Sequence, residues 1–115
     1  MTEVTAYDGS RIDIPGEMIE HVTRKHPQML SLASLTGERL LRSVVQALEN
    51  PNEVFVDDRD AKYFLIRVNA LYLNVIVSGG VVRTAYLIGE QRIRGWRRRD
   101  GYVVSSRTGH TRVAA

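Results

Sequence analysis

Three residues of this chain carry side chains that suit phosphodiester chemistry without a metal. His26, followed by Pro27, has an imidazole that exchanges a proton near neutral pH. Thr84 and Tyr86, in the segment Thr84-Ala85-Tyr86, supply a hydroxyl and a phenol that can hold phosphate oxygens by hydrogen bonds. Gathered on one basic sheet face, these groups would suit metal-free cleavage of RNA.

Cleavage by the 2′-hydroxyl of RNA needs three kinds of group. A base must take the hydroxyl proton, a cation must stabilise the charged phosphorane oxygens, and an acid must protonate the departing 5′-oxygen. His26 suits the first or the third task, and an arginine suits the second. Thr84 and Tyr86 are better suited to positioning the phosphate. This chemistry requires no cofactor, and none is expected.

A helix is predicted over residues 16–26, and Pro27 should end it. Its apolar residues recur at helical spacing: Met18, Ile19 and Val22. At about 100° per residue, His26 lies about 40° from the centre of this stripe and His21 about 105° from it. His26 should therefore point toward the sheet, with its protonated form favoured by the helix dipole. A satisfied, partly buried histidine that ends a helix is the alternative interpretation.

A second helix is predicted between Thr36, as N-cap, and the stop Asn50-Pro51. Its apolar stripe consists of Leu40, Leu41, Val44, Val45 and Leu48. The period then changes to that of extended chain, and strands are predicted at residues 53–56, 63–68, 71–77 and 81–88. The short connections between these strands favour an antiparallel meander.

These elements predict an α+β fold in which an N-terminal hairpin and two helices pack on a four- to five-stranded antiparallel sheet. The hairpin should span residues 2–14 around the turn Asp8-Gly9, and residues 102–106 should add an edge strand. We expect one nuclease-like domain over residues 1–107 and a flexible tail over residues 108–115.

Strand alternation predicts which side chains share a face. One side of the last predicted strand should hold Val82, Thr84, Tyr86 and Ile88. In the strand over residues 63–68, the apolar set that should face the helices is Phe64, Ile66 and Val68, and the opposite set is Tyr63, Leu65 and Arg67. The interpretation depends on which face of the last predicted strand the first helix covers. If the helix covers the face opposite to Thr84 and Tyr86, the nuclease interpretation loses its main support. Ordinary strand composition would also explain Thr84 and Tyr86.

Basic residues are concentrated in the second half of the chain. Residues 1–58 hold five Lys/Arg and ten Asp/Glu, whereas residues 59–115 hold eleven and three, so the halves carry about −5 and +8. The densest group surrounds Trp96 and comprises Arg92, Arg94, Arg97, Arg98 and Arg99. Arginines with an aromatic residue are typical of phosphate and base binding. A solvated charged loop is the alternative.

The composition excludes several kinds of site. The chain of 115 residues has no cysteine, which removes disulfides and thiolate metal sites. The two histidines of the first helix are five residues apart, a spacing that does not place two ligands on one helix face, so no metal site is predicted. The first ten residues are polar and no apolar run is long enough to span a membrane, which leads us to expect a cytoplasmic protein.

The order of the motifs resembles a known nuclease superfamily. A helix containing His21 to Pro27, a second helix ending at Asn50-Pro51, and strands ending in Thr84-Ala85-Tyr86 are similar to the phage and bacterial nucleases of the barnase, EndoU, colicin D and RelE-like group. The likeness spans roughly residues 17–88. It implies a metal-independent endoribonuclease in which a helix packs on an antiparallel sheet.

The resemblance also implies residue roles. The helix histidine of the family would fall on His26, with His21 as second choice, and its late-strand hydroxyl on Thr84, with Tyr86 beside it. The basic roles would fall on Lys62, Arg67 or Arg83. The arginine group around Trp96 lies outside the likeness.

The leading hypothesis is a small RNA-cleaving toxin or phage-derived effector that acts on tRNA or mRNA. Its expected partners are RNA and, for a toxin, a cognate inhibitor protein, and it would be a monomer or a homodimer. One alternative is a non-catalytic RNA- or protein-binding module on the same fold. Another is a housekeeping protein whose basic tail serves solubility.

Overall fold

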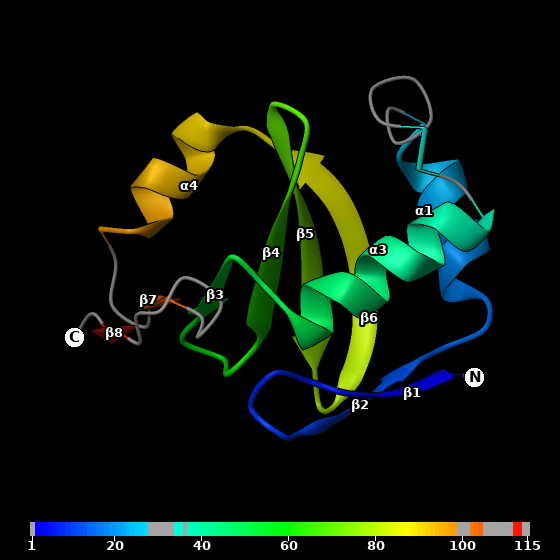
Figure 1. Ribbon diagram of the computed structural model, residues 1–115, viewed down its shortest axis with the longest axis horizontal. Helices are drawn as coiled ribbons and strands as arrows, with labels where there is room; N and C mark the ends of the chain where they lie inside the picture. Colours follow the sequence, from blue (N-terminus) through cyan, green and yellow to red (C-terminus); the bar gives the residue numbers. More distant parts are fainter. Residues whose placement is uncertain (1, 28–33, 36, 99–101, 105–111, 114–115) are drawn as a thin grey trace.

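The computed structural model describes residues 2–27, 34–35, 37–98, 102–104 and 112–113. Within these ranges three helices accompany an eight-stranded sheet of order β1-β2-β6-β5-β4-β3-β7-β8 (Figure 1). The predicted α+β class is confirmed, and the sheet has more strands than the four to five expected. None of the described helices is long and apolar enough to cross a membrane.

The N-terminal hairpin forms as predicted. It joins β1 (Thr2–Thr5) to β2 (Arg11–Ile14) through a turn in which Gly9 has φ +87°. Asp8 Oδ1 accepts hydrogen bonds from the backbone N–H and the hydroxyl of Ser10, at 3.0 and 2.6 Å. The hairpin meets the main sheet through one parallel pair, Asp13 with Val81.

Helices α1 (Met18–Lys25) and α3 (Gly37–Glu49) cover one side of the sheet, here called the helix face. The helix α1 begins two residues later than expected and ends at its C-cap His26, whose N–H donates to the Val22 carbonyl at 2.8 Å. The buried side chains of α3 include three of the apolar stripe predicted from the sequence, Leu40, Val44 and Leu48, and one outside it, Ala47.

The predicted meander is also confirmed. It consists of β3 (Glu53–Val56), β4 (Lys62–Val68), β5 (Leu71–Ser78) and β6 (Val81–Ile88), and each is antiparallel to the next. Beyond β3 the sheet continues with β7 (Tyr102–Val104) and β8 (Arg112–Val113). The strand β8 falls in the segment expected to be a tail, whose other residues lie outside the described ranges.

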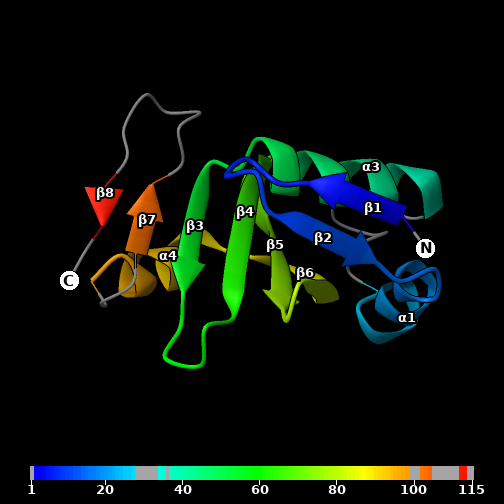
Figure 2. The ribbon, with the colours of Figure 1, turned by 90° about the horizontal axis from the view of Figure 1, so that it is seen from below.

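The second side of the sheet, here called the site face, is partly covered by a helix that sequence reasoning missed. This helix is α4 (Glu90–Trp96), and its Ile93 is fully buried against the sheet. The apolar contacts of α4 with this face include Phe55, Leu65, Tyr72 and Ile88. Figures 1 and 2 show α4 on the side of the sheet away from α3.

A β-bulge in β6 changes one predicted face assignment. Ile76 pairs with Thr84, but the next residue of β5, Val77, pairs with Val82, so Arg83 is an extra residue in the ladder. Val82 therefore packs in the helix-face core, and its expected place beside Thr84, Tyr86 and Ile88 is wrong. Beyond the bulge the alternation holds, because Ala85 is buried in the helix-face core and Tyr86 and Ile88 join the cluster on the site face.

Candidate functional site

The strand register places the predicted hydroxyl residues within the site face. Thr84 lies opposite Ile76 of β5, and Ile76 lies opposite Tyr63 of β4. Tyr86 lies in the next row, opposite Asn74 and, beyond it, Leu65. Thr84 and Tyr86 therefore share one face of β6, as their spacing predicts, and both are partly buried.

The helix α1 packs on the face of β6 opposite to Thr84 and Tyr86, which is the arrangement that counts against the nuclease interpretation, and only its C-cap residue His26 reaches Tyr86. The apolar side chains Met18 and Val22 anchor α1 in the helix-face core, beside β6. At the end of the helix, the ring centroids of His26 and Tyr86 are 5.4 Å apart, and their planes are inclined by 35°. Two residues singled out 60 positions apart in the sequence thus form a direct ring contact. The structure brings together His26, Tyr86 and the strand that carries Thr84.

The environment of His26 favours the neutral imidazole. Partial burial, together with the charges of His21 and Lys25, lowers the pKa of His26 below its ordinary value. This direction is opposite to the shift expected from the helix dipole. A neutral imidazole at neutral pH can accept a proton, so this environment suits a base better than an acid. His21 lies further back on α1 and acts on this site through its charge.

A pocket of about 500 Å³ adjoins Tyr86 on the site face. Its aromatic walls come from four separate elements: Phe55 of β3, Tyr63 of β4, Tyr86 of β6 and Trp96 of α4. The Trp96 ring stands nearly perpendicular to those of Phe55 and Tyr63, with centroids 5.4 and 5.3 Å away. Such edge-to-face pairs each contribute about 0.5–1.5 kcal/mol beyond area burial, so they hold the walls in place.

Two carboxylates of the β3–β4 turn complete this pocket. Asp57 accepts hydrogen bonds from the N–H groups of Arg59 and Ala61, both at 2.9 Å, and from the Tyr63 hydroxyl at 3.1 Å. Although burial opposes the shift, these bonds hold the pKa of Asp57 below its ordinary value. Burial and the neighbouring Asp57 raise the pKa of Tyr63, so its phenol stays protonated. Asp58 is exposed and also lines the pocket.

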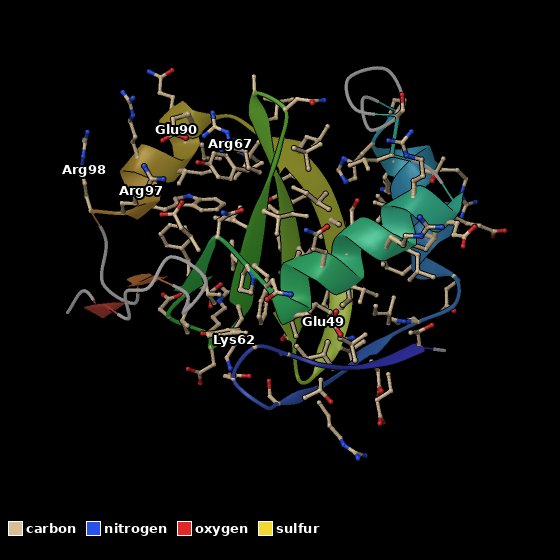
Figure 3. The ribbon with its side chains drawn as sticks, in the orientation of Figure 1. Glu49, Lys62, Arg67, Glu90, Arg97 and Arg98 are labelled. Atoms are coloured by element: carbon tan, nitrogen blue, oxygen red, sulfur yellow. The ribbon has the colours of Figure 1, made fainter. Side chains whose placement is uncertain are left out.

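The basic residues assigned to catalysis lie away from Thr84. Lys62 is on the helix face by alternation and forms an ion pair with Asp8 at 3.3 Å. Arg67 is on the site face, but its row is that of Tyr72 and Ile88, at the other end of β4 (Figure 3). Its Nη1 donates to the Tyr72 hydroxyl at 3.2 Å. Neither residue is placed to meet a phosphate held at Thr84 and Tyr86.

The arginines assigned to RNA binding divide into two groups. Arg97 is engaged inside the protein, with Nε and Nη2 each 2.7 Å from the Glu53 carboxylate oxygens and Nη1 2.9 Å from Glu90. The second group is exposed to solvent and comprises Arg83, Arg92, Arg94 and Arg98. Arg83 occupies the bulge and donates to the Ser78 carbonyl at 3.2 Å, and Arg98 points away from the molecule in Figure 3. Trp96 is a pocket wall, and Arg99 lies outside the described residues.

One polar side chain on this face has no partner in the described part of the chain. Asn74 is completely buried, and neither its amide nitrogen nor its amide oxygen makes a hydrogen bond there. It lies between Leu65 and Tyr86 in the strand register. Such a group costs about 1–3 kcal/mol of stability.

Among the described residues, no group of three His, Asp or Glu side chains is arranged to hold a metal ion. Comparison of the chain with protein-family models, with curated proteins and with solved structures gives no match. The case for a function therefore depends on the residues themselves.

Sequence reasoning missed the pocket. Besides Tyr86 and Trp96, its lining residues are Phe55, Val56, Tyr63 and the two aspartates of a turn, and none of these forms a motif with Tyr86. Alternation does put Tyr63 on the face of Arg67, and strand pairing through Ile76 then aligns it with Thr84. The pairing register of the strands would have linked Tyr63 to Thr84, but the sequence pattern of a single strand does not show which residues of the next strand lie opposite it.

Proposed function

We propose that this protein is a metal-independent endoribonuclease whose reaction is centred on His26, Tyr86 and Thr84. The observation that carries the proposal is the ring contact of His26 with Tyr86, at the edge of a pocket large enough for part of a nucleotide. The motif order of the sequence, which resembles the barnase, EndoU, colicin D and RelE-like nucleases, supports the same conclusion.

In the proposed reaction the 2′-hydroxyl attacks the adjacent phosphorus and the neutral His26 imidazole takes its proton. The bond from phosphorus to the 5′-oxygen breaks, which leaves a 2′,3′-cyclic phosphate and a 5′-hydroxyl that takes a proton from water. Thr84 and Tyr86 donate hydrogen bonds to the phosphate oxygens and hold them in place. Lys25, in the last turn of α1, adds positive charge beside His26.

A non-catalytic RNA-binding module is the second candidate, and one observation favours it. Arg67, Arg97 and Lys62 are all engaged by other groups of the protein, so they do not supply a free cation at the proposed phosphate position. A module that only binds RNA has no need of such a cation at a reacting phosphorus. The enzyme and the module therefore differ in whether cleavage accompanies binding.

The test compares cleavage of tRNA and of mRNA by the purified protein in EDTA. His26→Gln should reduce cleavage by about 100-fold or more, since a positioned base contributes on the order of 10²–10⁴. His21→Gln is the matched control on the same helix and should retain most of the activity. Thr84→Val and Tyr86→Phe should each cause a smaller loss, because each removes one hydrogen bond to the phosphate.

The products distinguish the two candidates. Fragments ending in a 2′,3′-cyclic phosphate, formed in EDTA and lost in His26→Gln, support the enzyme. RNA binding without cleavage by the unaltered protein supports the binding module and ends the proposal of catalysis. Cleavage that His26→Gln and His21→Gln reduce equally would exclude His26 as the base.

A further inference from the structure

The pocket beside Tyr86 has a lining that is unusual for a site next to a phosphate. Four aromatic rings and two carboxylates surround it, and none of its described lining residues is a lysine or an arginine. The carboxylates of Asp57 and Asp58 repel a phosphate, so the phosphate of an RNA ligand would stay outside, near His26. The aromatic faces of Tyr86, Tyr63 and Trp96 are suited to a base, because every base can stack on an aromatic ring.

The position of the pocket matches one nucleotide beside the proposed cleavage point. Tyr86 belongs to both features, since it contacts His26 and also lines the pocket. A volume of about 500 Å³ exceeds what a compact ammonium group would fill and accommodates a base with its ribose. A phosphate held between His26 and Tyr86 would therefore place an adjoining base within the pocket.

The carboxylates provide a means of discriminating between bases. An ionised carboxylate accepts hydrogen bonds and donates none. Asp57 is held rigidly by the bonds from Arg59, Ala61 and Tyr63, while Asp58 is exposed beside it. Cytosine, adenine and guanine each present an exocyclic amino group that donates to an acceptor. Uracil has carbonyl oxygens on both sides of its one ring N–H, and these oxygens would repel the carboxylates.

We propose that this pocket is a base-binding subsite that accepts an RNA base with an exocyclic amino group and disfavours uracil. The inference rests on the proposed endoribonuclease function, because that function makes RNA the ligand. It commits to a nucleotide as occupant. An organic cation, which aromatic walls and carboxylates also attract, is the competing occupant in the test.

The binding experiment uses Trp96, which is the one tryptophan of the sequence and lies in the pocket wall. Fluorescence excited near the red edge of tryptophan absorption is followed while CMP, AMP, GMP or UMP is added to the His26→Gln protein. We expect saturable quenching by CMP, AMP and GMP at about fivefold to tenfold lower concentration than by UMP. Because the readout is binding, it stands even if the protein proves to cleave nothing.

Two variants locate the preference. Asp58→Asn replaces one acceptor by an amide with donors, so it should reduce the preference against UMP to about twofold or less. Asp60→Asn is the matched control, since Asp60 belongs to the same turn but does not line the pocket, and asparagine tolerates its φ of +63°. This control should retain the full preference.

Three results would overturn the inference. Equal affinity for all four nucleotides would show that the carboxylates do not select. Saturable quenching by tetramethylammonium or by free arginine, with none by any nucleotide, would assign the pocket to a cation. Equal loss of preference in Asp58→Asn and Asp60→Asn would place its origin in the overall charge of the turn.

Discussion

The ion pair between Arg97 and Glu53 should be the main polar attachment of α4 to the sheet. Arg97 is the C-cap of α4, and two of its nitrogens meet the two oxygens of Glu53 at 2.7 Å. The Glu53 side chain is only 8% exposed, whereas that of Arg97 is 33% exposed. Hydrogen bonds from Arg97 to Glu53, with a further bond to Glu90, raise the pKa of the guanidinium, so Arg97 stays charged throughout the accessible pH range.

The change Arg97→Met keeps the aliphatic stem and removes the charge that neutralises Glu53. Removing one partner of a buried pair costs about 3–5 kcal/mol, and partial exposure of Arg97 places the loss near the lower value, about 3 kcal/mol. For a domain of this size each kcal/mol corresponds to roughly 3–6 °C, so Tm should fall by about 10 °C or more. The pocket should loosen as well, because Trp96 lies at the end of the same helix.

Urea unfolding followed by Trp96 fluorescence and by circular dichroism would measure this loss. Arg98→Met is the matched control, since Arg98 is the exposed neighbour, and it should change the free energy of unfolding by less than about 0.5 kcal/mol. A loss below about 1 kcal/mol for Arg97→Met would refute the argument.

A second substitution tests the cause. Glu53→Gln should destabilise the unaltered protein, because it weakens the bonds to Arg97, but it should stabilise the Arg97→Met protein, because it removes a buried carboxylate that has lost its bonds to Arg97. The same substitution thus changes sign between the two backgrounds. If Glu53→Gln destabilised both backgrounds equally, desolvation of Glu53 would not be the source of the loss.

Three further predictions concern titration and burial. Hydrogen bonds from Arg97 and Tyr72 lower the pKa of Glu90, so Glu90 contributes stability above about pH 4.5, and this contribution is lost as pH falls through the folded pKa. A plot of Tm against pH should show this loss, and the loss should be smaller in Arg97→Met. An Arg97→Met profile identical to that of the unaltered protein would contradict the prediction. Burial lowers the pKa of His26, so the cleavage rate plotted against pH should fall on the acid side with an apparent pKa below 6.5. This apparent pKa should move upward in His21→Gln, because a neighbouring positive charge is removed. An apparent pKa above 6.5 in the unaltered protein would exclude a neutral base at this position. Asn74→Leu should raise the free energy of unfolding by about 1 kcal/mol, because it removes an unsatisfied buried amide, and a loss in urea unfolding would mean that this amide has a partner.

Most of the fold could be predicted because its signals are local. The helix period in α3, the alternation in β4 and the turn Asp8-Gly9 each specify their own element, and short connections leave few ways to join the strands. The helix α4 gives a weaker signal: it has seven residues, a glycine near its end and one buried apolar residue, Ile93. Its stability comes from tertiary contacts with the site face, which no local pattern contains.

The candidate site was predictable only in part. The alternation beyond the bulge placed Thr84 with Tyr86. The helix period did not place His26, because His26 lies beyond the last helical residue of α1 and meets Tyr86 on the face opposite to the buried stripe of the helix. The position of Arg97 was not predictable, because an arginine in a basic cluster and an arginine paired with a distant glutamate look the same in sequence. The bulge at Arg83 was hidden for a similar reason, since an extra strand residue is visible only when the partner strand is aligned.

The distribution of charge around Tyr86 predicts the orientation in which RNA would bind at the proposed site. Tyr86 contacts His26, which directly follows the basic last turn of α1. Tyr86 also lines the aromatic pocket that holds the carboxylates of Asp57 and Asp58. A bound RNA would lower its free energy by placing phosphate toward α1 and a base toward the pocket, and the reverse orientation would set phosphate against two carboxylates. The basic surface of α4 would then add attraction for the chain as a whole, while the choice of the cleaved bond would lie with the residues that meet at Tyr86.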